Sequence, residues 1–182
     1  PSLVVRMNST HNFVLAFDLG VDRIVAAAVG LGGEVLATIH RSREDGPYPV
    51  KKAIATILES TDELFASLPT GAVLVGVGIA IPGVVETKLG FIRKAPNLGW
   101  LDVPFGQLMT DSLHAHIGVC PTVVLGNDAN LGAVAEYVRG AATATSSVVY
   151  LTGDVGVGGG VVLGGQVLAG GSGFAGELGH MV

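Results

Sequence analysis

The sequence predicts an α/β fold built on a mixed sheet, and two patterns support this. Three strand-like runs follow one another near the start, at residues 13–19, 23–29 and 34–40. From residue 48 the apolar spacing becomes helical, and helices then alternate with strands. Of the 182 residues, 49% are hydrophobic and 14% are charged, which is enough to fill a core and excludes a disordered chain.

The three opening strands are rich in Val, Ile, Leu and Phe and are separated by turns that contain glycine. Gly32-Gly33 predicts a tight hairpin between the second and the third. An amphipathic helix is expected from Tyr48, ended by Pro69 and Gly71. Residues 72–81 form a nearly continuous apolar run, which predicts a strand buried on both faces.

The remaining elements are shorter. Residues 86–104 contain several Pro, Asn and Gly residues and are expected to be mostly loop. We then expect, in order, a helix at 105–117, a buried strand at 121–125, a helix at 127–139 ended by Gly140, and strands at 147–152 and 161–163 that begin a second sheet.

The organisation predicts two lobes. Residues 1–12 are interpreted as a linker, residues 13–143 as a first lobe and residues 144–182 as the truncated start of a second. A strand, a glycine turn and a second strand occur in both lobes, at residues 13–29 and 148–163. Two such lobes facing across a cleft are typical of folds that hold a phosphate between them.

The charge balance limits the partners. The formal net charge is −5, so this part of the protein is not expected to contact nucleic acid itself. The only cysteine is Cys120, which excludes an internal disulfide and suits a reducing, cytoplasmic location. The longest apolar run, residues 72–85, contains Pro82 and is too short to span a membrane.

Two acidic motifs follow predicted strands. Asp18-Leu19-Gly20-Val21-Asp22-Arg23 could present a carboxylate and backbone N–H groups to a metal-bound phosphate, or could be a plain hairpin turn. In Asn127-Asp128-Ala129-Asn130, Asp128 could accept a proton from a sugar hydroxyl while Asn127 holds a neighbouring hydroxyl. Asp128 could equally be a helix N-cap.

Two glycine-rich segments follow. Gly156-Val157-Gly158-Gly159-Gly160 could cradle a phosphate with its backbone, although the charge of the nearby Asp154 would repel one. In the second segment, residues 170–180, Glu177 and His180 stand three positions apart and could share one helical face. A carboxylate there could accept sugar hydroxyls, and an imidazole could bind a hydroxyl or a metal.

Taken together these segments resemble the ROK family of repressors, open reading frames and kinases. The resemblance runs in family order from residue 13 to the end of the chain. It rests on Asp18-Leu19-Gly20, Gly78-Ile79-Ala80-Ile81-Pro82-Gly83-Val84-Val85, Ala95-Pro96-Asn97-Leu98-Gly99-Trp100, Asn127-Asp128-Ala129-Asn130, the glycine run at 156–160 and Ala175-Gly176-Glu177-Leu178-Gly179-His180-Met181-Val182.

The resemblance implies an actin-like ATPase (ribonuclease H-like) fold, a mixed sheet with helices on both faces. It also implies that Asp128 is the catalytic base if the protein is a kinase. Sugar-binding residues would be Gly83, Asn127, Asp128, Glu177 and His180. His180 also matches a ligand of the family's structural zinc, whose cysteine ligands would lie outside this chain. ATP and magnesium are implied only for a kinase.

Two loops depart from the pattern of the family's kinases. The first turn usually reads Asp-Xaa-Gly-Gly-Thr-Lys, so Val21 and Asp22 replace Gly and Thr after Asp18 and Gly20. The second usually reads Gly-Thr-Gly-Xaa-Gly-Gly-Gly, so Asp154-Val155 replaces Gly-Thr before Gly156 and Gly158. A like charge about 4 Å from a phosphate costs about 1 kcal/mol in water and several where partly buried. These changes indicate degenerate phosphate loops and favour a protein that is not an enzyme.

The sequence therefore favours a regulator of the NagC/XylR type, whose linker resembles Pro1-Ser2-Leu3-Val4-Val5-Arg6. A sugar effector would control DNA binding by a helix-turn-helix domain outside this chain, and the family implies a homodimer. An ATP-dependent hexose kinase is the first alternative. A catalytically inactive protein with a structural role is the second.

Overall fold

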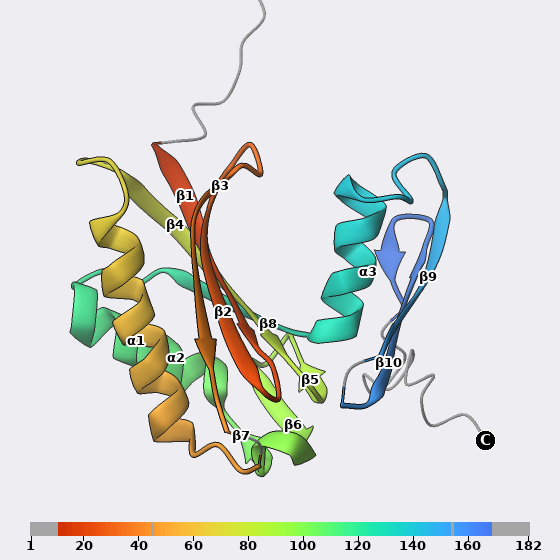
Figure 1. Cartoon of the computed structure of the whole chain (residues 1–182), viewed down its shortest axis with the longest axis horizontal. Coiled ribbons are helices and arrows are strands. Elements are labelled where there is room, and N and C mark those ends of the chain that lie inside the picture. Colours follow the sequence, from red (N-terminus) through yellow and green to blue (C-terminus); the bar gives the residue numbers. More distant parts are fainter. Residues whose placement is uncertain (1–10, 45, 154, 169–182) are drawn as a thin grey trace, which may run out of the picture.

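The computed structural model describes residues 11–44, 46–153 and 155–168, and its largest element is a five-stranded sheet in the order β3-β2-β1-β4-β8 (Figure 1). β1, β2 and β3 are antiparallel neighbours, whereas β4 and β8 run parallel to β1. The mixed sheet predicted from the sequence is confirmed. The strands are β1 (Asn12–Leu19), β2 (Arg23–Gly30), β3 (Val35–Ser42), β4 (Val73–Ile81) and β8 (Thr122–Asn127).

One face of this sheet carries the core. Phe13, Leu15, Phe17 and Leu19 alternate along β1 and are all buried. The helices α1 (Val50–Ala66) and α2 (Phe105–Ile117) pack over this face, as the helical spacing of their apolar residues predicts. Within the described parts of the chain, no helix is both long and apolar enough to cross a membrane.

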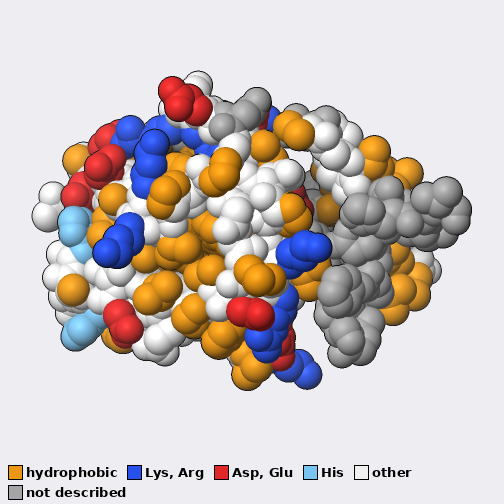
Figure 2. All heavy atoms as spheres, turned by 90° about the horizontal axis from the view of Figure 1, so that it is seen from below, with side chains coloured by type: hydrophobic (Ala, Val, Ile, Leu, Met, Phe, Trp, Pro, Cys, Tyr) orange, Lys and Arg blue, Asp and Glu red, His pale blue; other side chains and the backbone are white. Residues whose placement is uncertain are grey.

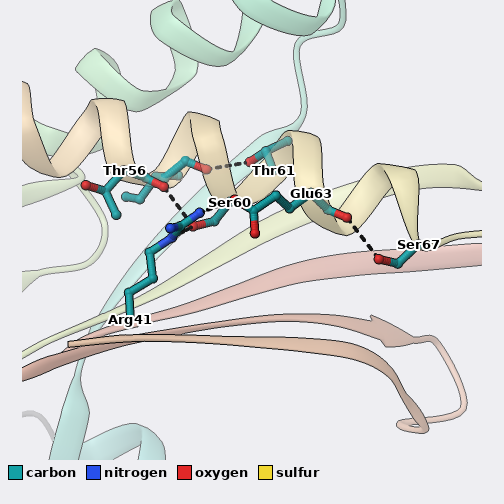
Figure 3. Close-up of polar contacts among 7 residues, drawn as sticks. Arg41, Thr56, Ser60, Thr61, Glu63 and Ser67 are labelled. Atoms are coloured by element: carbon teal, nitrogen blue, oxygen red, sulfur yellow. Dashed lines mark hydrogen bonds and ion pairs between the residues drawn. The ribbon is translucent and has the colours of Figure 1, made fainter.

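The helix α1 is also tied to the edge strand β3 by polar contacts (Figure 3). Arg41 on β3 donates from Nε to Ser60 Oγ at 3.0 Å and forms an ion pair with Glu63. The hydroxyls of Ser60 and Thr61 are buried, and each donates to the carbonyl four residues earlier in the helix. The buried polar atoms of α1 are therefore paired, as burial requires.

The opposite face of the sheet differs from the expectation. Val77, Ile79 and Ile81 of β4 are buried, but the residues between them are only half-buried, so the prediction of burial on both faces is wrong. The residues on this side are small, Gly76 and Gly78 among them, and a shallow hollow of about 280 Å³ lies over them. The continuous apolar run at residues 72–81 therefore does not show whether one face or both faces of the strand are covered.

Residues 84–103 form a second, smaller sheet rather than the expected loop. It consists of β5 (Val84–Glu86), β6 (Phe91–Ala95) and β7 (Trp100–Val103), all antiparallel, with a 3-10 turn η1 (Pro96–Leu98) before β7. The strands are only three to five residues long and are separated by turn residues. A strand this short does not show a recognisable alternation of apolar and polar residues.

Charges on this small sheet are paired with one another. Arg93 donates from Nε to Glu86 at 2.7 Å and from Nη1 to Asp102 at 3.0 Å. The hydrogen bond with Asp102, followed by that with Glu86, raises the pKa of Arg93 above its usual value. Among the described residues drawn in Figure 2, acidic and basic side chains are interspersed, without an extended basic patch on that face.

A third sheet follows the helix α3 (Asp128–Arg139) and consists of β9 (Ser147–Gly153), β10 (Val157–Leu163) and β11 (Gln166–Val167). α3 packs on β9 and β10 and lies on the opposite side of the large sheet from α1 and α2 (Figure 1). Helices therefore lie on both sides of the large sheet, as predicted, but α3 packs mainly on β9 and β10 and leaves the second face of the large sheet partly uncovered. The lobe boundary expected between residues 143 and 144 falls between α3 and β9 and stays a prediction.

Candidate functional site

The candidate site lies at the edge of the large sheet where its three parallel strands end. β1 is followed by Gly20, β4 by Pro82-Gly83 and β8 by Asp128. Because β1, β4 and β8 are parallel, these three turns come to the same edge. Open α/β sheets bind ligands at the carboxyl ends of their strands, so the fold brings the predicted residues to a place suited to binding.

Asn127 joins two of these turns. Its Nδ2 donates to the carbonyl oxygen of Gly83 and to Asp128 Oδ1, both at 3.0 Å. Its Oδ1 accepts from the backbone N–H of Asn130 at 2.9 Å, so Asn127 is the N-cap of α3. The alternative that Asp128 is the N-cap is therefore wrong, because Asn127 fills that position.

Asp128 is the first residue of α3 and is half-buried. Its Oδ1 accepts from Asn127 Nδ2 and from the backbone N–H of Ala129, the latter at 2.8 Å. Two hydrogen bonds to one oxygen fix the orientation of the carboxylate, and the helix N-terminus favours its negative charge. A carboxylate held in this way can accept a hydrogen bond, or a proton, from a hydroxyl group.

Gly83 has the backbone conformation and surroundings that only glycine accommodates. Its φ is +150°, and a Cβ atom there would lie 2.3 Å from the carbonyl oxygen of Lys94 and 2.9 Å from Ala95 Cα. The turn after β4 is thus packed directly on the end of β6, just before η1. Gly83 therefore contacts both the end of β6 and Asn127, which donates to its carbonyl oxygen.

A hollow of about 260 Å³ opens beside Asn127. Its polar lining residues are Thr87, Asn127 and Asn130, and the rest of the lining is apolar or glycine. Asn130 lines this hollow, and its Oδ1 is buried and, within the part of the chain that the structure describes, accepts no hydrogen bond. A buried acceptor without a donor is unfavourable, so Asn130 is a candidate to accept a hydrogen bond from a bound molecule once its side chain turns into the hollow.

The first turn is held by a residue that the sequence analysis did not single out. Arg43, just after β3, donates from Nη1 to the carbonyl oxygen of Val21 at 2.6 Å and from its backbone N–H to that of Asp22 at 2.8 Å. Asp22 itself is exposed and pairs with Arg23 at 3.3 Å. Its negative charge therefore lies at the surface of the turn that would receive a phosphate.

The second glycine run is mainly strand rather than loop. Gly156 lies in the turn before β10, but Gly158 and Gly160 are within β10. Cβ atoms at these two positions would lie 3.3 Å from Ala129 Cβ and 2.4 Å from the carbonyl oxygen of Ala129. The close packing of β10 on α3 therefore accounts for these glycines without a phosphate, and it brings Gly158 next to the residue after Asp128.

Three predicted residues, Asp154, Glu177 and His180, lie outside the described residues. Over residues 11–44, 46–153 and 155–168, no group of three His, Cys, Asp or Glu side chains is arranged to hold a metal ion. A zinc site would therefore need His180 together with ligands beyond those described. Neither Arg43 nor the unpaired Asn130 Oδ1 could have been found from spacing, because both depend on contacts between distant segments.

Comparison with known proteins shows which family this sequence is similar to. The sequence model of the ROK family matches residues 14–182. The chain is 28% identical over 180 residues to a xylose repressor from Caldicellulosiruptor bescii, covering 98% of this chain and 43% of that protein. It is 33% identical over 174 residues to a glucokinase from Halalkalibacterium halodurans, covering 94% of this chain and 50% of that protein.

Among solved structures, the chain is similar to a ROK family transcriptional regulator described as a homolog of the E. coli MLC protein. The TM-score is 0.78 at 26% identity, and the match covers 97% of this chain and 43% of that one. The chain thus spans half or less of the length of these three proteins. Repressors and sugar kinases both occur among its relatives.

Proposed function

Because this chain belongs to the ROK family, we propose that it is the sugar-binding part of a sugar-responsive transcriptional regulator. The observation that carries the proposal is the first turn. There, Val21-Asp22 stands where the family's kinases have Gly-Thr, and Arg43 bonds to the backbone of both residues. A turn with an added carboxylate at its surface is less suited to receive a phosphate, because like charges repel.

The sugar side of the site supports the same proposal. Asn127 and Asp128 are held by hydrogen bonds, and Asn130 Oδ1 is a buried acceptor without a donor among the described residues. Sugar hydroxyls are donors as well as acceptors, so they match these groups. Glu177 and His180 would complete the contacts. Xylose is the first sugar to test, because one matched relative is a xylose repressor.

In our proposal the protein is a cytoplasmic homodimer whose helix-turn-helix domain lies outside residues 1–182. Sugar binding changes lobe closure or dimer geometry and thereby the affinity for DNA. A structural zinc held in part by His180 belongs to the same proposal.

The second candidate is an ATP-dependent sugar kinase, which the similarity to a glucokinase at 33% identity favours. Asp128 would accept the proton of the sugar hydroxyl that attacks the terminal phosphoryl group of ATP. The hydrogen bonds from Asn127 and Ala129 would aim the carboxylate at that hydroxyl. Magnesium would supply the usual neutralisation of charge on the phosphates.

One experiment separates the two candidates. The full-length protein is incubated with labelled ATP, magnesium and a panel of pentoses and hexoses, and its binding to promoter DNA is measured with the same sugars. Sugar-dependent release from DNA without phosphoryl transfer is expected. Transfer above background that disappears in Asp128→Asn would overturn the regulator and establish the kinase.

A further inference from the structure

A cluster around Arg43 links the first turn to the sugar side of the site. Its guanidinium donates to carbonyl oxygens of three separate segments: Val21 at 2.6 Å, Gly46 at 2.9 Å and Asn97 at 3.4 Å. It also stacks on the Tyr48 ring at 4.9 Å. One planar cation is thus shared by the turn after β1, the loop before α1 and η1.

The segments that Arg43 joins are also bonded to one another. The backbone N–H of Tyr48 donates to the carbonyl oxygen of Leu98 at 2.9 Å, and Trp100 Nε1 donates to that of Tyr48 at 2.6 Å. Tyr48, Leu98 and Trp100 are all buried. The loop before α1 and η1 therefore behave as one packed unit, and Arg43 attaches the first turn to it.

This unit reaches the sugar side of the site through contacts already described. η1 directly follows Ala95, Ala95 packs against Gly83, and Gly83 accepts a hydrogen bond from Asn127. A continuous set of contacts thus runs from Val21 to Asn127. A displacement of the first turn would be passed along it, because close-packed segments do not move independently.

We infer that Arg43 is a positioning residue that holds the first turn in a fixed arrangement relative to η1 and, through Gly83, to Asn127. Sugar can then bind without a nucleotide, because no nucleotide is needed to order the first turn. The inference rests on the proposed function. The guanidinium holds the turn through its carbonyl oxygen, whereas a bound phosphate would hold it through backbone N–H groups. Lysine cannot replace it, because one ammonium group lacks the planar fork that spans several carbonyls.

The test measures sugar affinity by calorimetry in the full-length protein, with and without ATP and magnesium. Arg43→Met is compared with Arg41→Met, which removes the same charge two residues earlier but, among the described residues, breaks polar contacts only to Ser60 and Glu63. We expect Arg43→Met to weaken sugar binding about five-fold or more and Arg41→Met less than about two-fold. In Arg43→Ala, millimolar guanidinium should restore most of the affinity, and urea at the same concentration should not.

Hydrogen exchange supplies a readout that does not depend on sugar. Arg43→Met should speed exchange at residues 20–23 and at 96–99 together, and Arg41→Met should leave both unchanged. If the native protein binds sugar and Arg43→Met binds it equally well, the inference is overturned while the proposed function stands. If the native protein binds no sugar, the proposed function fails, and the sugar part of the inference with it. The exchange result still decides whether Arg43 couples the two segments.

Discussion

Asn127 donates a hydrogen bond from Nδ2 to the carbonyl oxygen of Gly83 at 3.0 Å, which joins the turn after β8 to the turn after β4. Both residues were predicted from the sequence to contact sugar, and their bond shows that they act as one support. Each residue also has a structural role, since Asn127 caps α3 and Gly83 packs on Lys94. Substitutions there must therefore be chosen to separate stability from binding.

Gly83→Ala should lower the free energy of unfolding by about 2 kcal/mol or more. Its positive φ is unfavourable for alanine, and the new Cβ would lie 2.3 Å from the Lys94 carbonyl oxygen. Urea denaturation followed by the fluorescence of Trp100, the only tryptophan, measures the change. Gly78→Ala on β4 is the control, because a Cβ there meets no atom within 4 Å. Equal losses from both variants would contradict the prediction.

Asn127→Ala and Asn127→Ser should differ in stability but agree in binding. Alanine removes the cap of α3, which costs about 1 kcal/mol, whereas serine can still accept the hydrogen bond from the Asn130 N–H. Neither side chain can donate to both Gly83 and Asp128 as the amide does, so the support of the sugar side of the site is lost in both variants. We expect both to weaken sugar binding about ten-fold, with only the alanine variant clearly destabilised, as measured by calorimetry and thermal unfolding. Normal sugar affinity in the serine variant would refute the role of Asn127.

Asn130→Ala should weaken sugar binding without lowering stability. Asn130 Oδ1 is buried and accepts no hydrogen bond within the described part of the chain, so removing it takes away an unfavourable group. If a sugar hydroxyl donates to it, its loss should reduce affinity about five-fold or more, as read from calorimetry. A variant that unfolds more easily but binds sugar normally would show that Asn130 is only structural.

Gly160→Ala should destabilise the protein by about 1–3 kcal/mol, whereas Gly156→Ala should change its stability little. A Cβ at Gly160 would lie 2.4 Å from the carbonyl oxygen of Ala129, so β10 would have to move away from α3. A Cβ at Gly156 meets no atom within 4 Å. Chemical denaturation of the two variants tests whether packing, rather than phosphate, requires glycine in β10. The explanation fails if Gly160→Ala is as stable as the native protein.

The elements that the sequence predicted well are those with long, regular spacing. α2 was expected at residues 105–117 and occupies Phe105–Ile117, because its apolar residues keep the helical period and Gly118 stops it. β5, β6 and β7 were missed because each is only three to five residues long. Their pairing depends on residues far apart in the chain, which no local pattern reports.

The candidate site was predictable only in part for the same reason. Asn127 and Asp128 stand at a strand-to-helix junction, which local spacing identifies, and Gly83 follows Pro82 at the end of a strand. Arg43 gave no signal, because its importance comes from carbonyl oxygens at Val21 and Asn97, contributed by other segments. Gly158 and Gly160 were interpreted as a phosphate loop because a glycine needed for strand packing resembles one needed for a ligand.

Restoring the kinase pattern in both loops should raise the affinity for ATP. The combined variant Val21→Gly, Asp22→Thr, Asp154→Gly and Val155→Thr removes two negative charges, and each is worth about 1 kcal/mol or more beside a phosphate. We expect ATP binding, measured by calorimetry with magnesium present, to strengthen about ten-fold or more. Glu34→Gln and Glu59→Gln together are the charge control, because they remove two carboxylates outside the site at no phosphate loop. If that control strengthens ATP binding equally, only net charge matters. If neither variant does so, the loops are not what separates this chain from a kinase.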